Sequence, residues 1–354
     1  MNPNVPKGRG TGNRPANVFE KSKLVKEFPE GIDAIDAETG PLTEFLPVES
    51  KSVLSFNDSP DIPFSYSINP YQGCEHGCVY CYARTSHQYW GYDAGLGFES
   101  KILIKKDCIG LLRKTFEKKT YRPSPIVLSG NTDCYQPAER KFKLTAAILE
   151  LCLEFGHPVS IITKNSLIDR DRETIRALAE RKLIHVYFSI NHLDSRLKQV
   201  MEPRTATSEK KLDLIRKFSA LGIPCGIMVA PIIPGINLEA MPQLIQQAGA
   251  AGARKAGYTV IRLNGPLKEL FQDWLETHFP DRKNKVMHQI ESLHGGQSND
   301  TQWGRRMKGE GALAQSISNL FRASVNKYMD PQRTMPEFDF TQFKRNGQLN
   351  LFNP

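Results

Sequence analysis

The sequence contains no uninterrupted apolar run that approaches the roughly 18 residues a membrane-spanning helix needs. Residues 1–17 are polar and glycine-rich, and they lack the apolar centre of a secretory signal peptide. The seven cysteines contain only one Cys-x-x-Cys pair and do not form the paired framework of disulfide-rich secreted proteins. We therefore expect a cytoplasmic protein with no membrane association.

Acidic residues are fewer than basic ones, 38 against 47, which gives a formal net charge of +9. Clustered basic side chains create a field that attracts polyanions such as nucleic acids. A basic soluble enzyme with no polyanionic partner has the same composition, so both interpretations stay open. Hydrophobic residues make up 40% of the 354 residues, which is enough for a sizeable core.

Three of the cysteines, Cys74, Cys78 and Cys81, lie within eight residues. Thiolates select zinc, Cu(I) or iron–sulfur clusters, and a structural zinc site or an ordinary four-iron cluster normally has a fourth protein ligand. The other four cysteines are isolated. This pattern favours a [4Fe–4S] cluster with one iron open to a substrate. The alternative is a Cys3His zinc site completed by His76 or His87.

The motif Cys-x-x-x-Cys-x-Tyr-Cys resembles the cluster loop of radical SAM enzymes. In that family, the open iron chelates S-adenosylmethionine (SAM), and an electron from the cluster cleaves SAM to a 5′-deoxyadenosyl radical. The resemblance implies that Cys74, Cys78 and Cys81 bind the cluster and that Tyr80 contacts the adenine of SAM. It also implies an electron donor such as flavodoxin or ferredoxin.

Short apolar runs alternate with amphipathic stretches from residue 64 onward, which is typical of βαβ units and a parallel sheet. We expect helices at about residues 139–155, with Gly156 as the left-handed C-cap, at 170–181 and at 208–221. The family resemblance implies an α/β fold with a partial (β/α)6 barrel of the TIM type, whereas periodicity alone also allows a doubly wound sheet. The six expected strands are residues 64–69, 126–129, 159–163, 185–190, 225–230 and 259–263.

Composition divides the chain into four parts. Residues 1–50 are predicted to form a flexible basic arm, because they mix lysine and arginine with Gly, Pro and Asn and show little apolar periodicity. Residues 51–265 are assigned to the partial barrel. Residues 266–345 are assigned to a C-terminal helical extension, with a helix near 314–328, and residues 346–354 to a polar tail.

Ligands of parallel barrels bind at the carboxyl ends of the strands, so the polar residues that follow the expected strands are candidates for the SAM site. Lys164 follows the third strand, where it neutralises a carboxylate or phosphate or is simply a solvated charge. Arg204 either pairs with the carboxylate of SAM or forms a structural ion pair. The resemblance implies further SAM contacts from the loops after the second, fourth and fifth strands, at Gly130, Asn131, Thr132, Asp133, Ser189, Ile233 and Gly235.

Cys134 lies in the loop after the second expected strand, four residues beyond Gly130. A thiol at that place can donate a hydrogen atom to a substrate radical, so we predict Cys134 as a catalytic residue. Packing beside the cluster is the alternative, because cysteine is often a small core residue.

Within the superfamily, residues 69–74, 81–84 and 132–137 resemble the spore photoproduct lyase group, also called DNA repair photolyase-like, and the likeness covers residues 50–265. It implies a substrate that is a nucleic-acid base or DNA lesion, and a carbon–carbon lyase reaction. Cys134 does not align with the cysteine of that lyase. The alternatives are radical modification of RNA or protein, and a non-catalytic metal-stabilised DNA-binding module.

Aromatic residues follow the cysteine motif and are flanked by basic residues, which is typical of a surface that stacks on a flipped base and contacts phosphates. Packing of the aromatic rings over the barrel mouth explains them equally well. The aromatic residues are Tyr82, Tyr89, Trp90, Tyr92 and Phe98, and the basic ones are Arg84, Lys101, Lys105 and Lys106.

The tail contains Gln348-Leu349-Asn350-Leu351-Phe352, which resembles the peptide that binds the bacterial sliding clamp. An extended peptide of this kind inserts Leu351 and Phe352 into a hydrophobic pocket, while Gln348 makes polar contacts. The alternative is that the tail docks on its own protein.

Overall fold

The computed structural model describes residues 8–11, 42–62 and 64–345. Its larger sheet has seven strands in the order β10-β9-β8-β7-β6-β3-β2. All neighbours pair in parallel except β2, which is antiparallel to β3 at the edge. The strands are β2 (Ser55–Phe56), β3 (Tyr66–Ile68), β6 (Ile126–Leu128), β7 (Val159–Thr163), β8 (Ile184–Ser189), β9 (Cys225–Ile232) and β10 (Lys255–Val260).

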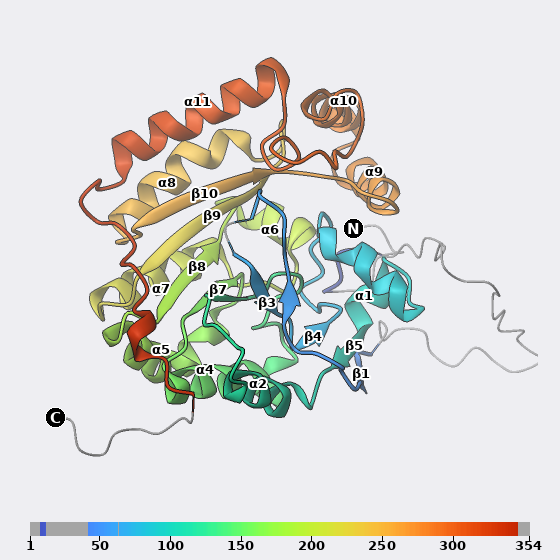
Figure 1. Ribbon diagram of the computed structural model, residues 1–354. Helices are drawn as coiled ribbons and strands as arrows, with labels where there is room; N and C mark the ends of the chain where they lie inside the picture. The colour runs from blue at the N-terminus through green and yellow to red at the C-terminus, as the bar shows by residue number, and fades with distance from the viewer. Residues whose placement is uncertain (1–7, 12–41, 63, 346–354) are drawn as a thin grey trace, which may run out of the picture.

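The six parallel strands follow one another in space in the same order as in the chain, from β3 to β10. A doubly wound sheet would reverse its strand order at a switch point, so that alternative is excluded. The sheet curves as a barrel does, but within the described residues β10 and β2 do not pair, and the barrel stays open (Figure 1). The predicted partial (β/α)6 barrel is therefore confirmed.

Five of the six strands lie within about two residues of their predicted bounds, but the sixth is Lys255–Val260 rather than 259–263. The strand was predicted to start too late, because Lys255 and Gly257 interrupt the apolar run by which strands were recognised in the sequence. Beyond Val260 the chain leaves the sheet, since the backbone N–H of Leu263 donates to the carbonyl of Ser298 (2.9 Å).

A second, three-stranded sheet was not predicted. Its order is β1-β5-β4, with β1 at Glu44–Pro47, β5 at Lys101–Ile104 and β4 at Tyr71–Gln72. These strands have two to four residues, too few to show a period in the sequence. Because β1 pairs with β5, the described end of the predicted flexible arm belongs to the folded structure.

Helices cover the outer side of the larger sheet, and α11 lies against α8 above β10 (Figure 1). The expected helix over residues 139–155 is interrupted at Lys143, whose φ is +53°, and it ends at Gly156, whose φ of +64° matches the predicted C-cap. The helices are α1 (Leu96–Ser100), α2 (Cys108–Glu117), α3 (Glu139–Phe142), α4 (Leu144–Phe155), α5 (Arg172–Glu180), α6 (Ser195–Met201), α7 (Ser208–Ala220), α8 (Met241–Ala250), α9 (Leu267–His278), α10 (Lys283–Leu293) and α11 (Gly311–Tyr328). The 3-10 helices are η1 (Tyr82–Trp90), η2 (Ser166–Asp171), η3 (Leu238–Ala240), η4 (Pro280–Arg282) and η5 (Phe340–Gln342).

Two large hydrophobic clusters stabilise the fold. The main core lies between the larger sheet and its helices. The second core joins α9 and α10 to α6 and to the cysteine-containing loop, through residues such as Val79, Met201 and Phe271. The Nε1–H of Trp274 in α9 also donates to the Val200 carbonyl of α6 (2.9 Å). The helices after the barrel therefore support the cysteine loop directly.

In the described parts of the chain, no helix combines the length and the apolar character that crossing a membrane requires.

Candidate active site

The three clustered cysteines lie in the loop between β4 and η1, beyond the carboxyl end of β3, as predicted. The backbone N–H of Cys74 donates to the Phe98 carbonyl (2.9 Å), and that of Cys81 donates to the Cys78 carbonyl (3.3 Å). Cys74 and Cys78 are buried, and Cys81 is half-buried. The segment from Cys74 to Cys81 is called the cysteine loop below.

Burial raises the pKa of all three thiols above the ordinary value of a cysteine. A buried thiol keeps its proton unless a positive partner stabilises the thiolate, and a bound metal is such a partner. All seven cysteines of the chain are free thiols. The loop is thus suited to bind a metal group through sulfur rather than to form disulfides.

The two histidines considered for a zinc site pack against other side chains. The Nε2 atom of His76 lies 3.0 Å from the Nδ2 atom of Asn165, and its Nδ1 atom lies 3.4 Å from Asp133. His87 is buried between the rings of Tyr92 and Phe98, at centroid distances of 5.3 and 5.6 Å. Within the described ranges, no three His, Cys, Asp or Glu side chains converge on a single-ion site. These contacts give no support to the Cys3His alternative.

Asp133 joins three of the strand-end segments. Its Oδ1 atom accepts a hydrogen bond from Thr163 (2.8 Å), and its Oδ2 atom accepts from the backbone N–H of Lys164 (2.7 Å). The same Oδ2 atom faces His76 of the cysteine loop. The carboxylate therefore orients the end of β7 and the cysteine loop relative to the loop after β6.

A buried network of charged and polar side chains surrounds Lys164. Its Nζ atom donates to Ser189 Oγ (2.9 Å) and lies 5.9 Å from the centre of the Tyr80 ring, and the Tyr80 hydroxyl donates to the carboxylate of Glu202. Lys211 lies 3.8 Å from that carboxylate and donates to the Ser189 carbonyl (3.0 Å). The predicted residues Tyr80, Lys164 and Ser189 are thus brought together.

The opposite charges in this network stabilise one another's ionised forms. Burial acts against charge on Lys164, but the carboxylates of Glu202 and Asp133 and the other negative neighbours together raise the pKa of the ammonium. Burial likewise acts against charge on Glu202, but Lys211 and the other positive neighbours lower the pKa of the carboxyl well below its usual range. Burial lowers the pKa of Lys211. We conclude that Lys164 and Glu202 are charged at neutral pH.

Two buried side chains just beyond β8 have polar atoms without a hydrogen-bond partner in the described structure. They are Asn191, both of whose amide atoms are unpaired, and His192, whose Nε2 atom lies 3.5 Å from Glu202 without hydrogen-bond geometry. Leaving such groups unpaired costs about 1–3 kcal/mol each, so a ligand or water normally pairs with them. Asn191 therefore indicates a ligand-binding position at the carboxyl end of β8.

The loop after β6 uses its polar groups to bind neighbouring segments. The backbone N–H of Asn131 donates to Asn69 (2.7 Å), its side chain donates to Ser86 (3.0 Å), and Thr132 Oγ1 donates to the Tyr71 carbonyl (2.6 Å). A Cβ atom on Gly130 would lie 2.8 Å from Ser67, which explains the glycine. This loop is packed against the β3–β4 segment and η1.

The last predicted positions lie at two further loops. The guanidinium of Arg204 is 3.4 Å from Glu75, so the alternative of a structural ion pair is present. The backbone N–H of Ile233 donates to Asn237 (2.7 Å), and Gly235, with φ of +76°, lies against α10. The segment after β9 is thereby held between the barrel and the C-terminal helices.

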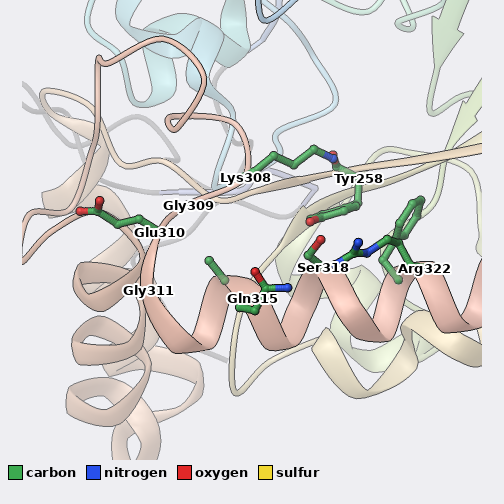
Figure 2. Close-up of a pocket in the computed structure, with 10 residues that line it drawn as sticks. Tyr258, Lys308, Gly309, Glu310, Gly311, Gln315, Ser318 and Arg322 are labelled. Atoms are coloured by element: carbon green, nitrogen blue, oxygen red, sulfur yellow. The ribbon is translucent and has the colours of Figure 1, made fainter.

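A surface pocket of about 420 Å³ lies between β10 and the start of α11 (Figure 2), and its lining includes none of the residues predicted above. The Nζ atom of Lys308 lies 3.5 Å from the ring centre of Tyr258 and donates to its carbonyl (2.9 Å). Two further charged residues of the lining are also engaged, since Glu310 pairs with Arg305 (2.8 Å) and Arg322 donates to Asn319 Oδ1 (2.8 Å). The strand-end residues, not this pocket, make the candidate active site.

A family model of the radical SAM superfamily matches residues 68–248, slightly more than half of the chain. This chain belongs to the radical SAM superfamily. The matched residues run from the end of β3 to α8 and include the cysteine loop and the whole strand-end network.

Relatives of this radical SAM protein occur in bacteria and archaea. An uncharacterized protein of Mycobacterium tuberculosis is 33% identical over 222 residues, which are 62% of this chain and 65% of the relative. An uncharacterized protein of Methanocaldococcus jannaschii is 29% identical over 193 residues, which are 54% of this chain and 69% of the relative. The match to the mycobacterial relative thus spans less than two thirds of its length.

Solved structures of spore photoproduct lyase have a similar fold. The lyase complexed with dinucleoside spore photoproduct superposes with a TM-score of 0.56 at 17% identity, over 80% of this chain and 79% of the lyase. A mutant with bound AdoMet and the same photoproduct gives a TM-score of 0.57 at 18% identity, over 83% and 82% of the two chains. At this identity the likeness establishes the fold.

The superfamily implies a [4Fe–4S] cluster and SAM, and the residues of the site fit both groups. Cys74, Cys78 and Cys81 supply three thiols, the number that suits a cluster with one open iron. The unpaired amide of Asn191 and the ammonium of Lys164 offer polar partners to a ligand at the strand ends.

Cys134 is fully buried in the main core. Its backbone N–H donates to Ser129 (2.8 Å), and its carbonyl accepts from Thr145 (2.6 Å). Burial, together with the neighbouring charge of Asp133, raises the pKa of its thiol well above the ordinary value. The burial favours the packing alternative, and the role as hydrogen donor stays a prediction.

The predicted stacking surface is smaller than expected. Tyr82, Tyr89 and Trp90 are exposed, whereas Phe98 and Arg84 are buried, and Arg84 pairs with Glu99. Two more of the predicted members are engaged elsewhere: Lys101 pairs with Glu44, and Tyr92 stacks on His87. The sequence suggested a wider surface because it shows which residues are aromatic or basic, but not which side they face.

Lys211, like Glu202, is a site residue that was not predicted from the sequence. It lies on α7 four residues before Ile215 and seven before Phe218, on the face that packs into the core, and it is fully buried. A lysine within an apolar helical stripe is the pattern by which it can be found. The predicted helix over 208–221 contained this pattern.

Proposed function

We propose that this chain is a radical SAM enzyme that reductively cleaves SAM and abstracts hydrogen from a nucleic-acid base, with damaged DNA as the preferred substrate. Membership of the superfamily supports the cofactors and the reaction class. The fold neighbour complexed with a dinucleoside photoproduct supports DNA, and with it a lyase-type repair of a carbon–carbon crosslink. The observation that carries the substrate proposal is a group of exposed aromatic side chains beside the cysteine loop.

The helix η1 begins immediately after Cys81 and exposes three aromatic side chains. The exposed fractions are 47% for Tyr82, 76% for Tyr89 and 41% for Trp90. Clustered apolar surface on a soluble protein marks a binding site, and flat rings stack on bases of any sequence. The Tyr82 hydroxyl donates to the Gly130 carbonyl (2.6 Å), so its ring lies at the edge of the loop after β6.

The loop between α10 and α11 adds an aromatic side chain and positive charge. Trp303 is 55% exposed. Asp61 holds this loop, because its carboxylate accepts from the backbone N–H of Gly304 (2.6 Å) and from the Nε–H of Arg306 (2.7 Å). Burial, and then the nearby charge of Arg306, lowers the pKa of Arg262 at the end of β10. Because Arg306 is paired with Asp61, Arg262 is the guanidinium of the two that we expect to contact a phosphate group.

When bound, the cluster supplies the electron that cleaves SAM and starts hydrogen abstraction. The chain itself binds and orients the reactants. Lys164 offers a charged donor to a carboxylate, Asn191 offers a donor and an acceptor, and the rings of η1 hold a base outside its stack. The electron comes from a reduced protein donor of the flavodoxin or ferredoxin class.

Anaerobic reconstitution of the full chain with iron and sulfide tests the enzyme class. We expect about four irons per chain, the count of the cluster that the superfamily uses, and release of 5′-deoxyadenosine on addition of dithionite and SAM. A Cys78→Ala variant should lose both and serves as the negative control. Bound zinc in place of iron, with no 5′-deoxyadenosine, would instead support the non-catalytic DNA-binding module.

Binding of labelled oligonucleotides tests the substrate class. We expect the reconstituted protein to bind a DNA strand that contains an ultraviolet-induced base lesion, and we expect the affinity to fall as the salt concentration rises, because bound phosphates release counterions. Equal or tighter binding of the matching RNA would shift the proposal to RNA modification. Absence of binding to both at low salt would overturn a nucleic-acid substrate.

We also propose that Gln348, Leu349, Leu351 and Phe352 bind the bacterial sliding clamp. These residues lie outside the described part of the chain. The segment just before them packs at the amino ends of the strands, where the Phe343 ring contacts the ring of His157 at 5.6 Å and the backbone N–H of Lys344 donates to the Phe155 carbonyl (2.9 Å). The last described residues before the motif therefore lie at the end of the sheet opposite the cysteine loop.

A further inference from the structure

Residues 8–11 pack directly on the cysteine loop. A Cβ atom on Gly10 would lie 1.7 Å from the carbonyl oxygen of Gly77, and a Cβ atom on Gly77 would lie 3.0 Å from the backbone nitrogen of Gly10. Gly77 precedes Cys78 and has a φ of +67°, which favours glycine. Thr11, the next described residue, is also buried. The two backbones touch, and neither position has room for a side chain.

A buried carboxylate connects this segment to one of the cluster cysteines. The backbone N–H of Gly10 donates to Glu99 Oε2 (2.9 Å), while Glu99 Oε1 accepts from Arg84 (2.6 Å). The Nε–H of Arg84 in turn donates to the carbonyl of Cys78 (3.0 Å). Glu99 and Arg84 are both fully buried, so water does not compete for these bonds.

Arg9 makes a second connection, to the beginning of the spacer between Cys74 and Cys78. Its guanidinium donates to the Glu99 carbonyl (2.5 Å) and to Thr43 Oγ1 (2.9 Å). The Thr43 hydroxyl donates to Glu75, the residue after Cys74 (3.1 Å). The spacer between Cys74 and Cys78 is thus contacted at Glu75 through Arg9 and at Gly77 through Gly10.

We propose that residues 8–11 are a positioning segment of the cluster site, which holds the spacer between Cys74 and Cys78 in the conformation that presents the three thiols and shields it from solvent. The glycine-containing spacer has no helix or strand of its own, so it depends on contacts from other segments for its conformation. This inference does not depend on the substrate or on SAM.

The test measures thiol access in the full-length, cluster-free protein under anaerobic conditions. Gly10→Ala forces the two backbones apart, and Gly110→Ala is the matched control, because a Cβ atom there meets nothing within 4 Å. Alkylation by a maleimide is followed at each cysteine by peptide mass spectrometry. We expect at least about tenfold faster labelling of Cys74, Cys78 and Cys81 in Gly10→Ala, on the logic that local opening controls access, and unchanged rates in Gly110→Ala.

Cys152 and Cys225 are internal references, since both are fully buried in the main core, away from this segment. Faster labelling at these two cysteines as well would mean general destabilisation and would overturn the proposal, as would unchanged rates at the three cluster cysteines. Arg9→Gln removes the bonds to Glu99 and Thr43 without adding volume. If Gly10→Ala does not fold, the same labelling rates are measured in Arg9→Gln, where we also expect faster labelling of the three cluster cysteines. After reconstitution, both variants should lose iron–sulfur absorption in air faster than the wild type.

Discussion

The Nη2 atom of Arg84 lies 2.6 Å from the Oε1 atom of Glu99, and both side chains are completely buried. The same guanidinium donates to the carbonyls of Cys78, Ala94 and Gly95, each at 3.0 Å. The three bonds to carbonyls therefore hold the backbone of the cysteine loop and of the segment leading to α1 in place. Arg84 is a structural residue of the site, although its sequence neighbourhood suggested a phosphate contact.

Replacing Arg84 by glutamine should lower the free energy of unfolding by about 3–5 kcal/mol, because it leaves the Glu99 carboxylate buried without its partner. The matched control is Arg113→Gln, which breaks a partly exposed pair with Glu154 and should cost about 1 kcal/mol or less. Urea denaturation of the cluster-free protein under reducing conditions measures both. Equal losses in the two variants would contradict the structural role of Arg84.

The protein should lose stability as the pH falls from about 6.5 to 4, partly through His157. Burial lowers the pKa of this histidine to about 4, and its Nε2 atom lies 2.8 Å from the Tyr121 hydroxyl. In the unfolded chain its pKa is about 6.5, so the unfolded state binds the proton first and gains stability below that pH. The contribution of neutral His157 to the free energy of unfolding is therefore complete above pH 6.5, and about 3 kcal/mol is lost when the pH falls to 4.

The variant His157→Gln isolates this contribution, because glutamine does not titrate. Its urea midpoint should fall less between pH 7 and 4.5 than that of the wild type. Some pH dependence should remain, since burial also lowers the pKa of His87 to about 4. A variant whose midpoint changes with pH as steeply as the wild type would show that His157 is not the group responsible.

The sequence predicted those features that repeat or that cluster locally. Strands such as Val159–Thr163 are continuous apolar runs, and Cys74, Cys78 and Cys81 are close in the chain, so both were found. Strands of two to four residues have no period, and the three-stranded sheet was missed for that reason. Arg84 and Glu99 look like surface charges in the sequence, because burial depends on distant segments that cover them. The contact between Gly10 and Gly77 bridges 67 positions and has no local pattern at all.

The substrate proposal predicts that the exposed rings of η1 contribute to binding. Tyr89→Ala and Trp90→Ala should each weaken the affinity for single-stranded DNA by about 5- to 150-fold, which corresponds to about 1–3 kcal/mol for each lost base stack. Phe340→Ala is the control, because Phe340 is 44% exposed but belongs to η5, far along the chain from the cysteine loop. Fluorescence anisotropy at fixed salt measures the affinities. Equal effects of all three changes would contradict a stacking surface on η1.

The two hypotheses for Cys134 differ in product formation. If Cys134 is a packing residue, the Cys134→Ala variant should be about 1 kcal/mol less stable than the wild type, the amount for about one buried methylene. Cys152→Ala should lose a similar amount of stability, because both side chains are fully buried. If Cys134 is a hydrogen donor, the Cys134→Ala variant should in addition form 5′-deoxyadenosine as the wild type does, but it should form less repaired product per SAM cleaved. Cys152→Ala should keep the wild-type ratio. An unchanged ratio in Cys134→Ala would remove the donor hypothesis.

The tail hypothesis predicts that the double change Leu351→Ala and Phe352→Ala abolishes binding to the bacterial sliding clamp, because these side chains fill the hydrophobic pocket in this mode of peptide recognition. Asn350→Ala is the matched control, since it lies within the same motif at a position that the motif does not specify. Surface plasmon resonance with immobilised clamp measures the full-length variants, and the urea midpoint of each measures docking of the tail on its own protein. A midpoint lowered by the double change, without clamp binding by the wild type, would favour intramolecular docking. Clamp binding that the double change leaves intact would place the contact elsewhere on the chain.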